Sequence, residues 1–166
     1  FLRQNRLASL ADMDAYQGHG GLAVGHAIPI LWPLIMEGGI QVNLDGKRFS
    51  DESAGYSEQA TRVLAQPGGV AFSIFDSRLH ELMLQFDDYQ DALEAGAVLR
   101  CDSIEALAEA LKVPARALAD TMDEERACKS AARDCPFGRD FTGKLPLQPP
   151  YHAVRVTGAL FHTQGG

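Results

Sequence analysis

The stretch GIQVNLDGKRF, residues 39–49, has the pattern of a β-hairpin. Ile40 and Val42 alternate with polar neighbours, which is typical of a strand with one buried face. The dipeptide Asp45-Gly46 follows, and it favours the positive φ angles of a tight hairpin turn. We therefore expect a strand, a turn, and a return strand that begins at Arg48-Phe49.

Downstream of this segment, the pattern indicates helices in the middle of the chain and a further strand near its end. Asp102 can cap a helix, with Glu105 three residues later, and Pro114 suits the first turn of the next helix. The order predicts an α+β fold, a small mixed or antiparallel sheet with packed helices. The expected elements are a helix at 56–66, a strand at 70–75, a short helix at 76–83, helices at 102–113 and 114–132, a Pro/Gly-rich loop at 135–150 and a strand at 151–156.

Upstream of the segment lies a glycine-rich stretch, YQGHGGLAVGHA, residues 16–27. It does not fit the G-x-G-x-x-G pattern of a dinucleotide-binding turn, and no strand is predicted before it. We therefore expect a loop here and no phosphate-binding site.

The composition limits the classes of partner. The chain has 166 residues, of which 46% are hydrophobic and 22% are charged, as in one soluble domain. Its formal net charge of −7 argues against nucleic acid and anionic membranes as partners. The longest apolar run, residues 27–36, contains Pro29 and Pro33 and is too short for a membrane span. A small molecule is the expected ligand.

The three cysteines, Cys101, Cys128 and Cys135, are odd in number and form no C-x-x-C motif. This pattern favours scattered reduced thiols in a cytoplasmic protein over a zinc site or a disulfide framework. No metal site is expected.

Four stretches together resemble the fumarate reductase/succinate dehydrogenase flavoprotein family. GGIQVNLDGKRFSDE resembles the family segment G-G/A-I-x-V-N-x-x-G-x-R-F-x-[DN]-E, and the C-terminal stretch resembles P-P-[FY]-Y-A-[VL]-x-[VI]…H-T-x-G-G. They occur in the family's order and cover nearly the whole chain. The stretches are residues 38–52, 71–79, 103–122 and 149–166.

The resemblance implies a capping domain. In that family a smaller domain is inserted into the FAD-binding domain and closes over flavin and substrate. Residues 1–166 would be one such domain, cut from a larger FAD-dependent oxidoreductase, with 158–166 as the return segment toward the FAD domain. The partner would then be the rest of its own FAD-binding domain. The isolated fragment is expected to be inactive and to bind FAD poorly.

The resemblance also implies site residues. His162 matches the histidine of H-T-x-G-G, which binds a substrate carboxylate in fumarate reductases, and Thr163, Gly165 and Gly166 match positions beside the cofactor. His19, in QGHGG, resembles a second substrate histidine. The alternatives are a polar residue at a strand end for His162 and a loop histidine for His19.

The chain departs from fumarate reductases at their proton relay. Tyr56 stands four residues after Glu52, where the family has its proton-donating arginine, and Trp32 and Ile35 occupy the places of the relay glutamate and arginine. The offset of Tyr56 resembles the N-E-x-x-x-Y motif of 3-ketosteroid Δ1-dehydrogenases. This implies that Tyr56 is a catalytic acid/base together with His162 and His19, unless it is ordinary packing at a helix start.

The function expected from these features is transfer of a hydride between flavin and a C–C bond next to a carbonyl or carboxylate. Two alternatives stay open. One is a non-catalytic ligand-binding or interaction module of shared ancestry. The other is a fumarate reductase-like carboxylate reductase with a rearranged site.

Overall fold

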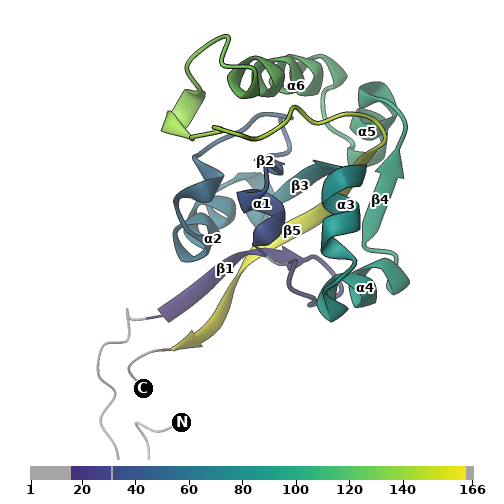
Figure 1. The fold of residues 1–166 in the computed structure, drawn as a ribbon. Helices are drawn as coiled ribbons and strands as arrows, with labels where there is room; N and C mark the ends of the chain where they lie inside the picture. The colour runs from purple at the N-terminus through teal and green to yellow at the C-terminus, as the bar shows by residue number, and fades with distance from the viewer. Residues whose placement is uncertain (1–15, 31, 164–166) are drawn as a thin grey trace, which may run out of the picture.

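The computed structural model describes residues 16–30 and 32–163, which form one antiparallel sheet with helices packed around it (Figure 1). The order along the five-stranded sheet is β1-β5-β3-β2, and β4 also pairs with β5. The α+β class is therefore confirmed. The strands are β1 (Tyr16–Ala23), β2 (Ile40–Val42), β3 (Val70–Asp76), β4 (Val98–Cys101) and β5 (Tyr151–Thr163).

Strand β5 organises the sheet. β3 pairs with it along one edge, from Tyr151 opposite Asp76 to Thr157 opposite Val70. β4 pairs along the other edge over 151–154, and β1 continues that edge from Val156 to Thr163. Figure 1 shows β1 and the end of β5 running side by side away from the body of the molecule, at the end opposite α6.

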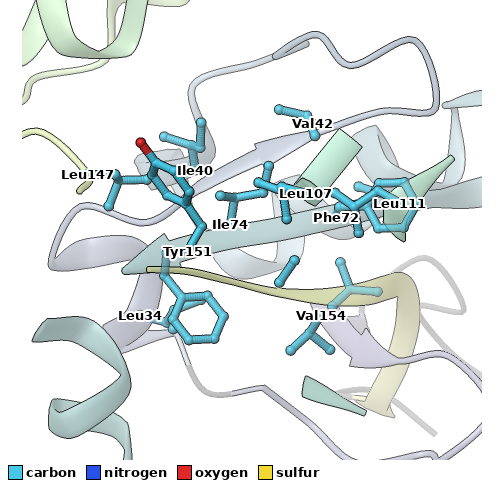
Figure 2. Packing of buried hydrophobic residues seen from close by; sticks show 14 of the residues in the cluster. Leu34, Ile40, Val42, Phe72, Ile74, Leu107, Leu111, Leu147, Tyr151 and Val154 are labelled. Atoms are coloured by element: carbon cyan, nitrogen blue, oxygen red, sulfur yellow. The ribbon is translucent and has the colours of Figure 1, made fainter. Parts of the chain in front are cut away.

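The core fills the space between the sheet and the helices. Figure 2 shows buried side chains from strands β2, β3 and β5 meeting others from helices and from the loop near Leu147. Burial of such apolar area is the main stabilising contribution to folding. The helices are α1 (Pro33–Met36), α2 (Tyr56–Leu64), α3 (Ser77–Met83), α4 (Asp87–Glu94), α5 (Ile104–Leu111) and α6 (Ala115–Lys129).

Residues 16–23 form a strand, so the prediction of a loop was wrong there, while residues 24–27 lie outside any helix or strand as predicted. Gly20 allows close packing of this strand against α2. A Cβ on Gly20 would lie 2.9 Å from the backbone carbon of Gln59, and one on Gly158 of β5 would lie 2.4 Å from the carbonyl oxygen of Ala60. Glycine inside a strand marks such an approach of two backbones.

The predicted hairpin at 39–49 is also wrong in its pairing. Ile40–Val42 is a strand, but its partner is β3, with Ile40 opposite Ile74. The turn itself forms: the Asn43 N–H donates to the Lys47 carbonyl at 2.9 Å, and Gly46 has a φ of 73°. No return strand begins at Arg48, whose side chain donates to the buried carboxylate of Glu52.

The remaining elements follow the sequence with local differences. The predicted helices and strands form, and β5 runs on to Thr163 instead of ending at 156. Ser103 caps α5 in place of Asp102, and its Oγ accepts a hydrogen bond from the Ala106 N–H at 3.1 Å. Asp102 pairs with Arg100 instead. Helix α4 and strand β4 were not predicted. Within 16–30 and 32–163, no helix is long and apolar enough to cross a bilayer.

Candidate functional site

Three aromatic side chains from distant parts of the sequence meet beside β1. The imidazole of His19 stacks on the ring of Tyr56 with centroids 5.9 Å apart. The indole of Trp32 meets both edge-on, at 5.8 Å from His19 and 6.2 Å from Tyr56. We call His19, Trp32 and Tyr56 the aromatic cluster.

Gln17 holds the hydroxyl of the cluster. Its side-chain amide donates a hydrogen bond to the Tyr56 Oη. One residue along each element, the Gly18 N–H donates to the Ser57 Oγ at 3.2 Å, which ties β1 to the start of α2. Tyr56 as a residue remains 37% exposed, and its hydroxyl accepts the hydrogen bond from Gln17.

His19 is buried in this setting. It is 7% exposed, and burial lowers the pKa of its imidazole. Its Nδ1 accepts a hydrogen bond from the Gly21 N–H at 3.1 Å, which places the proton of the neutral ring on Nε2. A Cβ on Gly21 would lie 3.2 Å from His19 Cε1, so the glycine permits this approach.

The sheet brings His162 to the same place through its backbone. In the β1–β5 ladder His162 stands opposite Gln17, and Thr163 stands opposite Tyr16. The residue that holds the Tyr56 hydroxyl is therefore the ladder neighbour of His162. Gly165 and Gly166 lie outside the described residues.

Beneath the aromatic cluster lies a buried carboxylate with two guanidinium partners. Glu52 accepts from Arg48 at 2.7 and 2.8 Å and from Arg139 at 2.9 Å, and it also accepts from the Gln41 N–H at 3.1 Å. Burial raises the pKa of Glu52, but these donors and the charges of Arg48 and Arg139 outweigh it and hold the pKa below its usual value. We call Glu52, Arg48 and Arg139 the ion cluster.

A chain of buried amides connects β1 to α2. The Gln41 side chain donates to the Gly20 carbonyl at 2.9 Å and accepts from the Gln59 amide at 2.9 Å. Gln59 in turn accepts from the Ser50 hydroxyl at 2.8 Å. Satisfied buried networks of this kind fix one arrangement of the elements that they join.

The structure thus brings Tyr56, His19 and the backbone of His162 together. Sequence reasoning missed Gln17, although it stands two residues before His19, because the stretch was interpreted as a loop. It also missed Arg139, which nothing near it in the sequence marks. In the described part of the chain, no group of three or more His, Cys, Asp or Glu could hold a metal ion.

Comparison with known proteins gives the family context. A family model described as an FAD binding domain matches residues 2–166. A probable fumarate reductase of Shewanella frigidimarina is 32% identical over 164 residues, which is 96% of this chain and 26% of that protein. An NADH:acrylate oxidoreductase of Vibrio harveyi is 28% identical over 149 residues, 89% of this chain and 14% of that protein.

Solved structures agree on the fold. The open form of a flavocytochrome c3 fumarate reductase matches with a TM-score of 0.80 and 30% identity, over 96% of this chain and 28% of that one. A 3-ketosteroid Δ1-dehydrogenase from Sterolibacterium denitrificans matches at a TM-score of 0.71 and 22% identity, over 96% and 34%. A fumarate reductase flavoprotein subunit structure from Lactobacillus plantarum, solved by NMR, matches at 0.62 and 18%, over 85% and 96%. The last two show the fold alone. The chain spans about a quarter of the Shewanella relative's length.

Proposed function

This chain belongs to the FAD-dependent fumarate reductase/succinate dehydrogenase flavoprotein family, and from that premise we propose that it is the substrate-side capping domain of a larger oxidoreductase. The coverage of its relatives supports the proposal, because the match covers about a quarter of their length. The remaining length leaves room for a separate FAD-binding domain, which would be its partner.

The described residues fit one wall of a flavin site and not a whole one. All pairings of the sheet are antiparallel, so these residues contain no parallel βαβ unit of the kind that cradles a dinucleotide. By the family resemblance, Thr163, Gly165 and Gly166 would lie against the cofactor where β5 leaves the domain. FAD supplies hydride transfer in such enzymes.

Tyr56 is the proposed acid/base. The observation that carries the proposal is the hydrogen bond to the Tyr56 hydroxyl from Gln17, the ladder neighbour of His162, on a residue that is 37% exposed. A hydroxyl fixed in this way can donate a proton to, or accept one from, a substrate carbon or oxygen that enters over the aromatic cluster.

The two histidines have different proposed roles. His162 would bind the electron-withdrawing group of the substrate, as the resemblance implies. His19 is buried, stacks on Tyr56 and has a pKa lowered by burial, so we propose that it supports the Tyr56 ring.

The proposed substrate is an apolar carbonyl compound and not a dicarboxylate. Trp32 and Ile35 place apolar groups where the proton relay of fumarate reductases has charged ones, and Tyr56 replaces the arginine. A neutral phenol cannot hold a carboxylate in the bidentate way of a guanidinium.

One alternative keeps an observation in its favour. The similarity to fumarate and acrylate oxidoreductases favours a carboxylate reductase with a rearranged site.

Flavin bleaching in the full-length protein tests the proposal. Without oxygen, the oxidised enzyme should be reduced by a saturated cyclic ketone and not by succinate, or the reduced enzyme reoxidised by an α,β-unsaturated ketone and not by fumarate. Brisk turnover of fumarate would establish the carboxylate reductase instead. Stoichiometric, tight FAD binding by residues 1–166 alone would contradict the capping role.

A further inference from the structure

Arg139 crosses the interior from a distant loop to reach the elements beneath the aromatic cluster. It follows α6 in the sequence and is 4% exposed. Its Nη2 donates to the carbonyl of Ile35 at 2.6 Å. Its Nη1 donates to the carbonyl of Gly39 and to the Glu52 carboxylate, both at 2.9 Å.

Ile35 and Glu52 belong to two different turns, and each turn adjoins a member of the aromatic cluster in the sequence. Ile35 lies in the single turn of α1, and the residue that begins this turn is Trp32. Glu52 begins a short 3₁₀ turn, Glu52–Ala54, which leads through one glycine to Tyr56 at the start of α2. One guanidinium therefore ties the turn that carries the indole to the turn that precedes the phenol.

Burying Arg139 with one unpaired nitrogen costs free energy, which argues that the residue fixes the geometry of its neighbours. The Nε of Arg139 is buried and has no hydrogen-bond partner among the described residues. The ring of Phe141 covers the guanidinium, with its centroid 4.2 Å from Cζ. A buried ion cluster often stabilises a protein no better than apolar packing of the same volume, and its better-supported use is to specify one arrangement.

We propose that Arg139 is a positioning residue of the candidate site, which sets the distance and angle between Trp32 and Tyr56. The proposal rests on the proposed function in one respect, the designation of the aromatic cluster as the site. The planar fork of arginine suits the task, because three acceptors at fixed directions need two nitrogens held rigidly.

The chain contains a built-in probe of this geometry. Trp32 is its only tryptophan. The fluorescence of residues 1–166 therefore reports the surroundings of one indole, which touches both His19 and Tyr56. No substrate or flavin is needed for the measurement.

The test compares Arg139→Met and Arg139→Lys with Lys129→Met, each at a temperature where its far-UV circular dichroism is native. Lys129 is a matched control: it is buried, donates to the Gly38 carbonyl at 2.6 Å and lies under the same Phe141 ring. It bonds to neither Ile35 nor Glu52. We expect both Arg139 variants to shift the emission maximum of Trp32 and to change its quenching by acrylamide, and Lys129→Met to retain the wild-type values.

Lysine carries its three donors on one nitrogen and cannot reproduce the planar pair of nitrogens that Arg139 uses. Arg139→Lys therefore carries the test if Arg139→Met does not fold. Wild-type emission and quenching in either folded Arg139 variant would overturn the proposal. An equal change in Lys129→Met would overturn it as well, because the effect would then be general loosening.

Activity measurements separate this proposal from the proposed function. In the full-length enzyme, Arg139→Lys should lower kcat more than it raises KM, because the acid/base is misplaced while apolar binding is kept. If Tyr56→Phe leaves turnover unchanged, the proposed function fails. The fluorescence comparison still decides whether Arg139 sets the geometry of the cluster.

Discussion

Two groups of histidine and tyrosine lie along β5, and they differ in exposure. At one, His19 stacks on Tyr56, which is 37% exposed. At the other, near the start of β5, the imidazoles of His80 and His152 stack in parallel with centroids 4.5 Å apart, and His80 Nδ1 lies 2.8 Å from the hydroxyl of Tyr89. Tyr89 is 0% exposed. We call the second group the histidine stack.

The comparison shows that residue types alone do not make a site. Burial raises the pKa of Tyr89, so its hydroxyl stays protonated. The hydroxyl bonds to His80 inside the core. Burial, together with the charges of His80 and Arg100, lowers the pKa of His152 to about 4. In the aromatic cluster the histidine is buried in the same way, but the tyrosine is 37% exposed. We expect this exposure to give a substrate access to the cluster, and single substitutions in each group test the expectation.

The largest expected effect comes from Tyr56→Phe in the full-length enzyme. Removing a positioned acid/base should slow the substrate-dependent change in flavin absorbance by about 10²–10⁴-fold, the usual contribution of such a group. Stopped-flow absorbance of the flavin measures it.

Tyr89→Phe is the matched control in the histidine stack. It removes the same hydroxyl from a buried position, so turnover should stay near wild type while the melting temperature falls slightly. A control that slows turnover as much as Tyr56→Phe would remove the distinction between the two groups.

The second prediction concerns His162, the ladder neighbour of Gln17. Replacing it by alanine in the full-length enzyme should lower turnover by about 10²-fold, the scale for one positioned polar group. His80→Ala, in the histidine stack, should lower stability and leave kcat nearly unchanged. Steady-state kinetics of both variants decide the point, and normal kinetics for His162→Ala would leave it as a strand-end residue.

The fold was largely predictable where local pattern and final pairing agree. Residues 70–75 and 102–113 carry clear periodicity, and both elements form. The strand at 16–23 was not predicted, because glycine usually indicates a loop. Here glycine is needed because the backbone of α2 lies too close for a Cβ on Gly20. This requirement comes from residues distant in the sequence, so no local sequence pattern can reveal it.

The site was predictable only through family motifs. These indicated Tyr56, His19 and His162, and the sheet register places the backbone of His162 near the other two. The place of Gln17 in the site depends on the pairing of residues 16–23 with β5, which sets it opposite His162. Arg139 bonds to Ile35 and Gly39 across about a hundred residues of sequence, a contact that only tertiary structure reveals.

The smallest expected effect is a dependence of stability on pH that belongs to the histidine stack. The pKa of His152 is about 4 in the folded chain, against an ordinary value of 6.5. Between these values the unfolded chain binds more protons than the folded one, so the free energy of unfolding falls as the pH is lowered from 6.5 to 4. Below pH 4 both states are protonated and this contribution stops changing.

His152→Phe should reduce that dependence. The groups around His152 act in both directions, since His80 and Arg100 disfavour its charged form and Asp76 favours it. Phenylalanine keeps the stack on Phe75, whose ring lies 5.5 Å from that of His152, and it cannot titrate. Urea unfolding at pH 7 and pH 4.5 should show a loss of stability that is smaller in the variant by about 1–2 kcal/mol, the work of protonating one group across this window. An identical pH dependence in both proteins would mean that His152 keeps an ordinary pKa in the folded chain and is protonated there at pH 4.5. The histidine stack would then carry charge, and its contrast with the aromatic cluster would rest on the exposure of the tyrosines alone.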